Sequence, residues 1–205
     1  EALTDQVETD PQRAGQIITA ETQRLDRLVG DLLGLSRLEA DDFRLDLCWI
    51  DLVALVRTAG VAWQPTWPAL TVELPDQEHW VRTDPIRLRQ VIDALVDNAV
   101  RIIPSDAPLI LALTDEGVIQ VRDGGPGLSD EDIAVAFDKG VLHLRHKSER
   151  GGSAGLGLAL AARLIQRLGG TLQAGRAPEG GASFTICLTA PTTMHLHQGV
   201  DAPSA

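Results

Sequence analysis

The sequence predicts an α+β fold in which a domain of mixed helices and strands is preceded by a helical hairpin segment. The chain has 205 residues, of which 44% are hydrophobic, and this is enough for one full domain with an appendage. Apolar residues recur with helical spacing through residues 12–40. After residue 47, segments with helical spacing alternate with short segments typical of strands.

Residues 12–40 are predicted to form one long helix with a leucine-rich face. Its apolar positions follow heptad-like spacing, at Ile18, Leu25, Leu28, Leu32 and Leu35. The segment before it, which ends at Asp10-Pro11, has the pattern of the last turns of another helix. We therefore expect residues 1–46 to be a partial helical hairpin, mainly its second helix. Because one helix cannot bury so wide an apolar face alone, we expect a homodimer through this hairpin.

Residues 47–190 are predicted to form the main domain, and 191–205 a flexible tail. Helices are expected at 51–63, 83–103, 129–137 and 155–170, and strands at 70–75, 79–83, 108–123 (a hairpin), 171–175 and 182–190. Thr83 or Asp84 suits the N-cap of the second helix, with Pro85 in its first turn. Ser129 and Asp132 have the spacing of a capping box.

The composition excludes several classes of function. A formal net charge of -11 disfavours binding to nucleic acid or to an anionic membrane. No apolar run approaches the roughly 18 residues that a membrane span needs. Cys48 and Cys187 match no metal-binding spacing, and we expect two buried thiols in a reducing cytoplasm. Since the only methionine is Met194, we expect the chain to be a fragment of a longer protein.

The stretch "VRDGGPGLS" indicates a loop that a ligand approaches closely. Asp123 stands at the end of a predicted strand, where its carboxylate can accept a hydrogen bond from an exocyclic amine such as that of adenine. Gly125 and Gly127 would leave room for a flat base or a phosphate. The alternative is an ordinary Asp-Gly surface turn.

The helix from 85 to 103 carries two stripes. Its core stripe is Leu88, Val91 or Ile92, Leu95, Ala99 and Ile102. Beside it run Ala94, Asn98 and Arg101. An amide oxygen followed by a guanidinium suits a polyphosphate with bound magnesium, although a solvated helix face is the alternative.

Glycines gather before the last predicted helix, at positions 151, 152, 155 and 157. Free amide N–H groups and the positive end of a helix dipole there would favour phosphate. The run is not a Walker loop, because no Gly-Lys-Ser/Thr follows it. It is not the dinucleotide-binding fingerprint either, because no predicted strand directly precedes it.

These features occur together and in one order, and this order resembles the ATP-binding domain of sensor histidine kinases of two-component systems. That family belongs to a wider group with type II topoisomerases, heat-shock chaperones of the same fold and mismatch-repair ATPases. "RLRQVIDALVDNAVRI" resembles the asparagine box, "DGGPG" the first glycine box, "AFDKG" the phenylalanine box and "GSAGLGL" the second glycine box. "RLDRLVGDLLGLSRLEA" is similar to the second helix of the dimerisation and phosphotransfer hairpin. The resemblance covers residues 12–190 and implies a two-layer α/β sandwich, the Bergerat-type ATP-binding fold.

The resemblance also implies ATP and Mg²⁺ as cofactors and gives each site residue a role. Asn98 would ligate magnesium, Arg101 would reach the phosphates, and Asp123 would bind the adenine amino group. The remaining candidates for nucleotide binding are Gly125, Gly127, Lys139, Arg145, Lys147, Arg150, Gly155, Leu156 and Gly157. The segment between Phe137 and Gly155 would be the ATP lid.

Four positions depart from the family pattern. Ala94 stands where an asparagine is frequent and Ile102 where an aromatic residue is frequent, and Gly140 and Val141 replace further aromatic residues. Ala94 also stands where hydrolysing relatives carry the glutamate that activates water, which disfavours a free-standing ATPase. A nucleotide-binding pseudokinase that acts as an interaction module is the other alternative.

The resemblance therefore implies a kinase that transfers the γ-phosphate of ATP to a histidine on the dimerisation hairpin, for relay to an aspartate of a response regulator receiver domain. That histidine should be followed by an acidic residue on a helix. None of the five histidines, at 79, 143, 146, 195 and 197, fits this context. We therefore expect no autophosphorylation from this chain alone, and a cytoplasmic location with the parent protein anchored in a membrane.

Overall fold

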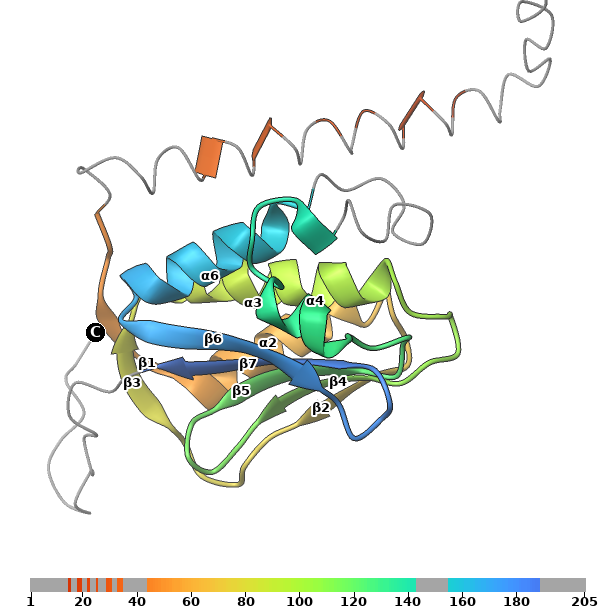
Figure 1. Ribbon diagram of the computed structural model, residues 1–205. Helices are drawn as coiled ribbons and strands as arrows, with labels where there is room; N and C mark the ends of the chain where they lie inside the picture. The colour runs from red at the N-terminus through yellow and green to blue at the C-terminus, as the bar shows by residue number, and fades with distance from the viewer. Residues whose placement is uncertain are drawn as a thin grey trace, which may run out of the picture.

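The computed structural model describes residues 44–142 and 155–188, together with helical positions between 15 and 34 at Gly15, Ile18, Thr19, Thr22, Leu25, Val29, Gly30, Leu33 and Gly34. The elements of the main domain are β1 (Cys48–Asp51), α2 (Leu52–Trp63), β2 (Leu70–Glu73), β3 (Trp80–Thr83), α3 (Pro85–Val100), β4 (Leu109–Leu113), β5 (Ile119–Asp123), α4 (Asp130–Ala134), α6 (Gly157–Arg167), β6 (Gly170–Arg176) and β7 (Ala182–Leu188) (Figure 1).

The domain consists of a sheet and a layer of helices, which confirms the predicted two-layer sandwich. Five strands form the main sheet in the order β2-β4-β5-β7-β6. Strand β2 is parallel to β4, and the other pairs are antiparallel. Helices α2, α3 and α6 pack against one another in that order and contact the sheet. A separate two-stranded ribbon pairs β1 with β3.

Carboxylate caps fix the start of α2, which follows β1, and of α3, which follows β3. Asp51 accepts hydrogen bonds from the N–H groups of Val53 and Ala54 at the start of α2. Asp84, and not Thr83, is the N-cap of α3, and Pro85 follows it in the first turn. Ser129 caps α4 by accepting a hydrogen bond from the N–H of Asp132, as its spacing predicted.

The β4–β5 connection is the predicted hairpin. Gly117 has a φ of 79°, a conformation that favours glycine. In the same turn the Thr114 side chain hydrogen-bonds the exposed Glu116 carboxyl and, with a smaller contribution from the Glu116 backbone, holds the pKa of Glu116 below its ordinary value.

The core lies between the helices and one face of the sheet. In β5 the inward residues Ile119 and Val121 are buried, and they alternate with partly exposed polar residues. Helix α3 contributes the apolar stripe Leu88, Val91, Ile92, Leu95, Val96 and Ala99. This helix ends at Val100, earlier than predicted, so that Ile103 rather than Ile102 is buried beside it. Pro104 is a physical reason, since it disfavours helical geometry at the residue before it.

One strand was missed, and one further expectation was wrong. Strand β1 was not predicted, because its four residues pair only with β3 and show no clear alternation in burial. Cys48, in that ribbon, is exposed and Cys187 is half-buried, so the two thiols are not core residues. Cys187 alternates along β7 with the buried Phe184 and Ile186, and its side chain therefore faces away from the helices.

The described helices include none that is long and apolar enough to cross a membrane. Arg145, Lys147 and Arg150 of the predicted lid lie outside the described residues, as do Leu28, Leu32 and Leu35 of the predicted leucine face.

Candidate functional site

Three predicted motifs come together at one side of the domain. Helices α3 and α6 run antiparallel, so that the C-terminal end of α3 and the N-terminal end of α6 point the same way (Figure 1). The loop after β5 packs against the residues that follow α3, since a Cβ at Gly125 would lie 2.9 Å from Ile103 Cγ2. The asparagine-bearing helix, the Asp-Gly loop and the glycine turn before α6 therefore border one region.

Asp123 is a buried carboxylate held by backbone donors. Only 5% of its surface is exposed. Its Oδ1 accepts hydrogen bonds from the N–H of Gly125 at 2.9 Å and from the N–H of Ala182 at 3.1 Å. Its backbone carbonyl accepts a third from the N–H of Gly181 at 3.0 Å. These bonds offset the cost of burying the charge and fix the direction of the carboxylate.

The glycines of this loop are required by the packing of the protein itself. A Cβ at Gly124 would lie 2.5 Å from Pro108 Cδ, and Gly127 has a φ of 77°. A closer approach than at Gly124 occurs at Gly181, which the sequence did not single out, because a Cβ there would lie 2.2 Å from Asp123 Oδ1. The loop after β5 and the β6–β7 turn therefore form one packed unit around Asp123.

Asn98 and Arg101 lie at the C-terminal end of α3, and both are half-buried. Arg101 is the C-cap residue, and its guanidinium forms an ion pair with the Asp97 carboxylate one turn earlier. The pair is partly exposed, with side-chain exposures of 22% for Arg101 and 37% for Asp97. The guanidinium that was predicted to reach phosphate is thus paired within its own helix.

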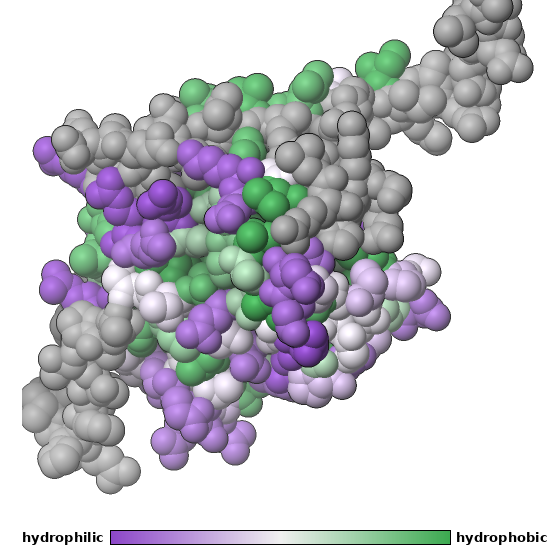
Figure 2. Space-filling view, viewed as in Figure 1, coloured by the Kyte–Doolittle hydropathy of each residue, from purple (hydrophilic) through white to green (hydrophobic). Residues whose placement is uncertain are grey.

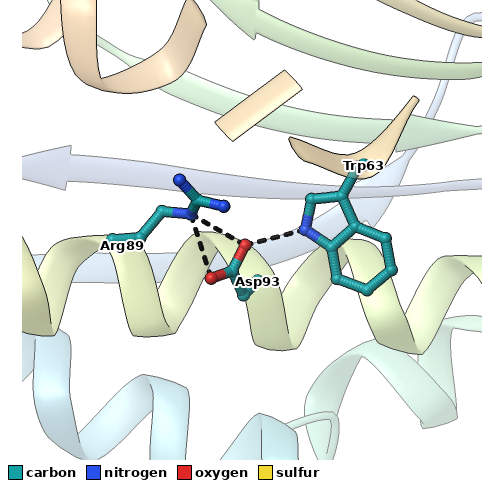
Figure 3. A network of polar contacts seen from close by, with 3 residues as sticks. All are labelled: Trp63, Arg89 and Asp93. Carbon is teal, nitrogen blue, oxygen red and sulfur yellow. Dashed lines mark hydrogen bonds and ion pairs between the residues drawn. The ribbon is translucent and has the colours of Figure 1, made fainter. Parts of the chain in front are cut away.

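The Asp93 carboxylate, next to Ala94 on α3, is engaged elsewhere. Trp63 Nε1 donates a hydrogen bond of 2.7 Å to Asp93 Oδ1, and Arg89 Nε lies 2.9 Å from both carboxylate oxygens (Figure 3). Ala94 packs against the core. Because Asp93 joins α3 to α2, it does not take the place of a base at position 94.

The glycine turn before α6 is tied to the phenylalanine segment. The N–H of Gly140 donates to the carbonyl of Gly155 at 3.2 Å, and both glycines have positive φ, of 75° and 70°. Leu156 is the N-cap of α6 and makes no side-chain capping bond, so the first N–H groups of a helix that begins at Gly157 are not capped by it. Phe137 packs edge-to-face on Phe184, with ring centroids 6.3 Å apart. Lys139 is exposed.

The donor set at this region suits magnesium only as part of a phosphate complex. Among the described residues, no group of three or more His, Cys, Asp or Glu side chains could hold a metal ion. One amide oxygen, from Asn98, is the kind of ligand that Mg²⁺ uses when substrate phosphates and water complete its coordination.

Comparison with known proteins agrees with this geometry. The family model of "Histidine kinase-, DNA gyrase B-, and HSP90-like ATPase" matches residues 83–192. The sensor histidine kinase WalK of Bacillus subtilis is 28% identical over 176 residues, which cover 82% of this chain and 29% of WalK. The sensor protein SphS of Synechococcus elongatus is 34% identical over 198 residues, which cover 90% of this chain and 48% of SphS. The chain thus spans less than half the length of these curated relatives.

Solved structures show the same similarity. The histidine kinase AdeS of Acinetobacter baumannii superposes with a TM-score of 0.70 at 26% identity, over 91% of this chain and 88% of that chain. Full-length ShkA, solved in complex with AMPPNP, gives a TM-score of 0.67 at 25% identity, over 88% of this chain and 39% of that chain.

Proposed function

Because this chain belongs to the family of histidine kinase-, DNA gyrase B- and HSP90-like ATPases, as the ATP-binding catalytic domain of a sensor histidine kinase, we propose that it binds Mg²⁺-ATP between the β5 loop, α3 and α6. In this proposal Asp123 accepts a hydrogen bond from the adenine amino group. Asn98 ligates magnesium, and Arg101 and the first-turn N–H groups of α6 receive the phosphates. Lys139, Arg145, Lys147 and Arg150 are further phosphate contacts in the proposal.

The observation that carries the proposal is the fixed carboxylate at the end of β5. A base is rigid and nearly neutral, so its recognition needs an acceptor whose direction does not change. Asp123 has that property, because three hydrogen bonds from Gly125, Gly181 and Ala182 hold its side chain and backbone. The neighbouring glycines keep side chains away from the same edge.

The charges on α3 support a requirement for magnesium. The C-terminal end of a helix carries a partial negative charge, which repels phosphate. Arg101 is paired with Asp97, so this helix end offers no net positive charge to a polyphosphate. When bound, Mg²⁺ supplies the missing positive charge on the phosphates. Asn98, as a neutral oxygen ligand, adds no further negative charge to the site.

Phosphotransfer is favoured over hydrolysis. Ala94 cannot take a proton, and Asp93 is bound to Arg89 and Trp63. The α3 helix therefore provides no general base for water at these positions. We propose that the acceptor is a histidine supplied from outside residues 1–205, on a dimerisation hairpin, and that the phosphate passes on to an aspartate of a response regulator. The use of ATP places this reaction in the cytoplasm in our proposal, with the longer protein anchored in a membrane.

A titration with nucleotides tests the proposal. We expect ATP and ADP to bind with a strong dependence on magnesium, and GTP to bind more weakly because guanine presents a carbonyl where adenine has its amino group. Calorimetry with and without EDTA measures this. Equal affinity for ATP and GTP would count against Asp123 as the base-reading residue.

A labelling experiment separates the kinase from its rivals. With γ-phosphate-labelled ATP we expect negligible labelling of this chain and very slow phosphate release. A hairpin with a histidine followed by an acidic residue, added in trans, should become labelled. Binding without transfer to that hairpin would favour the pseudokinase, and rapid phosphate release would favour an ATPase.

The helical segment supports self-association. At its described positions Ile18, Leu25, Val29 and Leu33 are between 51% and 66% exposed. Figure 2 shows hydrophobic residues spaced along this helix at the top of the view. We propose that a second copy covers them in a four-helix arrangement. Sedimentation should show an association that Leu25→Asp weakens, and a monomer at all concentrations would reject it.

A further inference from the structure

We infer that Arg122 is a positioning residue for base recognition: through Glu179 it holds the β6–β7 turn, and the backbone of that turn holds Asp123. The inference rests on the proposed role of Asp123 in binding adenine. It adds residues on the opposite face of the sheet that the glycine boxes do not include.

Arg122 precedes Asp123 in β5 and its side chain faces away from the helices, because alternate residues of a strand point to opposite faces. This side chain is only 17% exposed and lies between two carboxylates. Its Nη2 is 2.7 Å from Glu73 Oε2 in β2, and its Nε is 3.3 Å from Glu179 Oε1 in the β6–β7 turn. Nη1 also donates to Gln120 Oε1 at 3.2 Å. One guanidinium therefore joins the end of β2, β5 and the turn.

The turn itself is compact and lies against the Asp-Gly loop. The N–H of Ala177 donates to the carbonyl of Gly181 at 2.9 Å, and the N–H of Gly180 donates to the carbonyl of Ala177 at 3.0 Å. The Glu179 carbonyl oxygen would be 3.5 Å from a Cβ at Gly124. A displacement of Glu179 thus moves a segment that touches the loop after β5.

The last residue of this turn and the first residue of β7 donate hydrogen bonds that help to fix Asp123. The N–H of Gly181 donates to the backbone carbonyl of Asp123, and the N–H of Ala182 donates to its Oδ1. Gly181 and Asp123 are in close contact, because a Cβ at Gly181 would overlap the Asp123 carboxylate. The direction of the carboxylate therefore depends on where the turn sits.

The contact between Arg122 and Glu179 is an attraction of charges rather than a directed hydrogen bond. Neither Arg122 Nε nor Glu179 Oε2 has a hydrogen-bond partner among the described residues, and both atoms are buried. A neutral isostere at Glu179 would therefore lose the interaction almost completely. Glu73 is the natural comparison, because it binds the same guanidinium but belongs to β2, which pairs with β4 and not with the turn.

The test compares Glu179→Gln with Glu73→Gln. We expect Glu179→Gln to weaken ATP binding by about threefold to tenfold, to lower the preference for ATP over GTP, and to speed amide exchange at Gly181 and Ala182. Glu73→Gln should change none of these by more than about twofold, although both variants replace a charged partner of Arg122 by a neutral one.

A double-mutant cycle distinguishes the proposed coupling of Arg122 and Glu179 from a general loss of folding. Arg122→Gln should weaken ATP binding as much as Glu179→Gln, and the double variant should be no weaker than either single one. Equal effects of the two glutamate variants, or unchanged ATP binding and ATP/GTP preference in Glu179→Gln, would overturn the inference. Asp123→Ala separates the two hypotheses: if it abolishes binding while Glu179→Gln does nothing, only the positioning role fails. If Asp123→Ala also does nothing, the proposed adenine site fails with it.

Discussion

The two ends of the proposed nucleotide site are built on opposite principles. At the base end, Asp123 is buried and held by backbone donors from two loops that are far apart in sequence. At the phosphate end, Asn98 and Arg101 are half-buried side chains on one helix, and Arg101 is paired within that helix. A rigid base is read well by a group that cannot move, whereas a flexible polyanion is bound by charges that can be exchanged. We therefore expect substitutions at the base end to change both the ATP affinity and the free energy of unfolding. Substitutions at the phosphate end should change mainly the ATP affinity.

Asp123→Ala should have the largest effect, because it acts on both properties. Removal of the carboxylate leaves the buried N–H of Ala182 and the partly buried N–H of Gly125 without their acceptor, which should lower the free energy of unfolding by about 2–4 kcal/mol. Loss of the bond to adenine should weaken ATP binding by about 10- to 100-fold. Urea unfolding and calorimetry measure the two effects.

Asp123→Asn is the matched control for this substitution. Its side-chain oxygen can still accept from the backbone, so the stability should be largely kept, while its amide N–H₂ would face the adenine amino group and binding should stay weak. Wild-type ATP affinity in Asp123→Asn would show that this carboxylate does not read the base.

Gly181→Ala should disturb the same end by crowding. The added methyl would lie 2.2 Å from Asp123 Oδ1, so the turn or the carboxylate must shift, at a cost of about 1–3 kcal/mol in stability and with weaker ATP binding. Gly175→Ala is the control in the adjacent strand, because nothing lies within 4 Å of the added atom. Equal melting temperatures for the two variants would contradict the packing at Gly181.

The sequence was informative where the interactions are local. The caps at Asp84 and Ser129 and the β4–β5 turn depend on residues within four positions of one another. The sequence predicted the Ser129 cap and the hairpin, and it indicated Asp84 as one of two candidates for the N-cap of α3. The sequence could also have predicted that α3 ends before residue 103, since Pro104 disfavours helical geometry at the residue before it. The Asp97–Arg101 pair has the ordinary i, i+4 spacing of helix ion pairs. The family resemblance nevertheless assigned Arg101 to the phosphates and did not predict that Asp97 neutralises its charge.

What the sequence did not show depends on contacts between distant segments. Gly181 looks like an ordinary turn glycine, and its constraint arises from Asp123, from which α4, α6 and β6 separate it in the sequence. Arg122 looks like a solvated residue of an exposed sheet face, but Glu73 and Glu179 enclose it. Strand β1 has only one partner, β3, and its burial does not alternate. In each case the partner, not the local pattern, determines the role.

Asn98→Ala should show the opposite behaviour to Asp123→Ala. The side chain is half-buried, so the free energy of unfolding should change by less than about 0.5 kcal/mol. Binding of Mg²⁺-ATP should weaken by about tenfold, and the difference from the wild type should disappear in EDTA, because the amide acts through the metal. A variant that loses the same affinity with and without magnesium would argue that Asn98 contacts the nucleotide directly.

Asp97→Asn should have the smallest effect and the most specific one. The Asp97–Arg101 pair is partly exposed on one helix, so its loss should lower stability by only about 0.3–0.5 kcal/mol. The same substitution removes a negative charge next to the proposed phosphates and releases Arg101 from its partner. Metal-free ATP should then bind a few-fold more tightly, while Mg²⁺-ATP changes less, because the metal already neutralises part of the phosphate charge. The ratio of the affinity for Mg²⁺-ATP to the affinity for metal-free ATP, measured by titration with magnesium and with EDTA, should fall.

Asp93→Asn is the control, since Asp93 binds Arg89 and Trp63 instead of Arg101, and it should leave the ratio unchanged. An unchanged ratio in Asp97→Asn would mean that the ion pair does not set the dependence on magnesium at this end of α3.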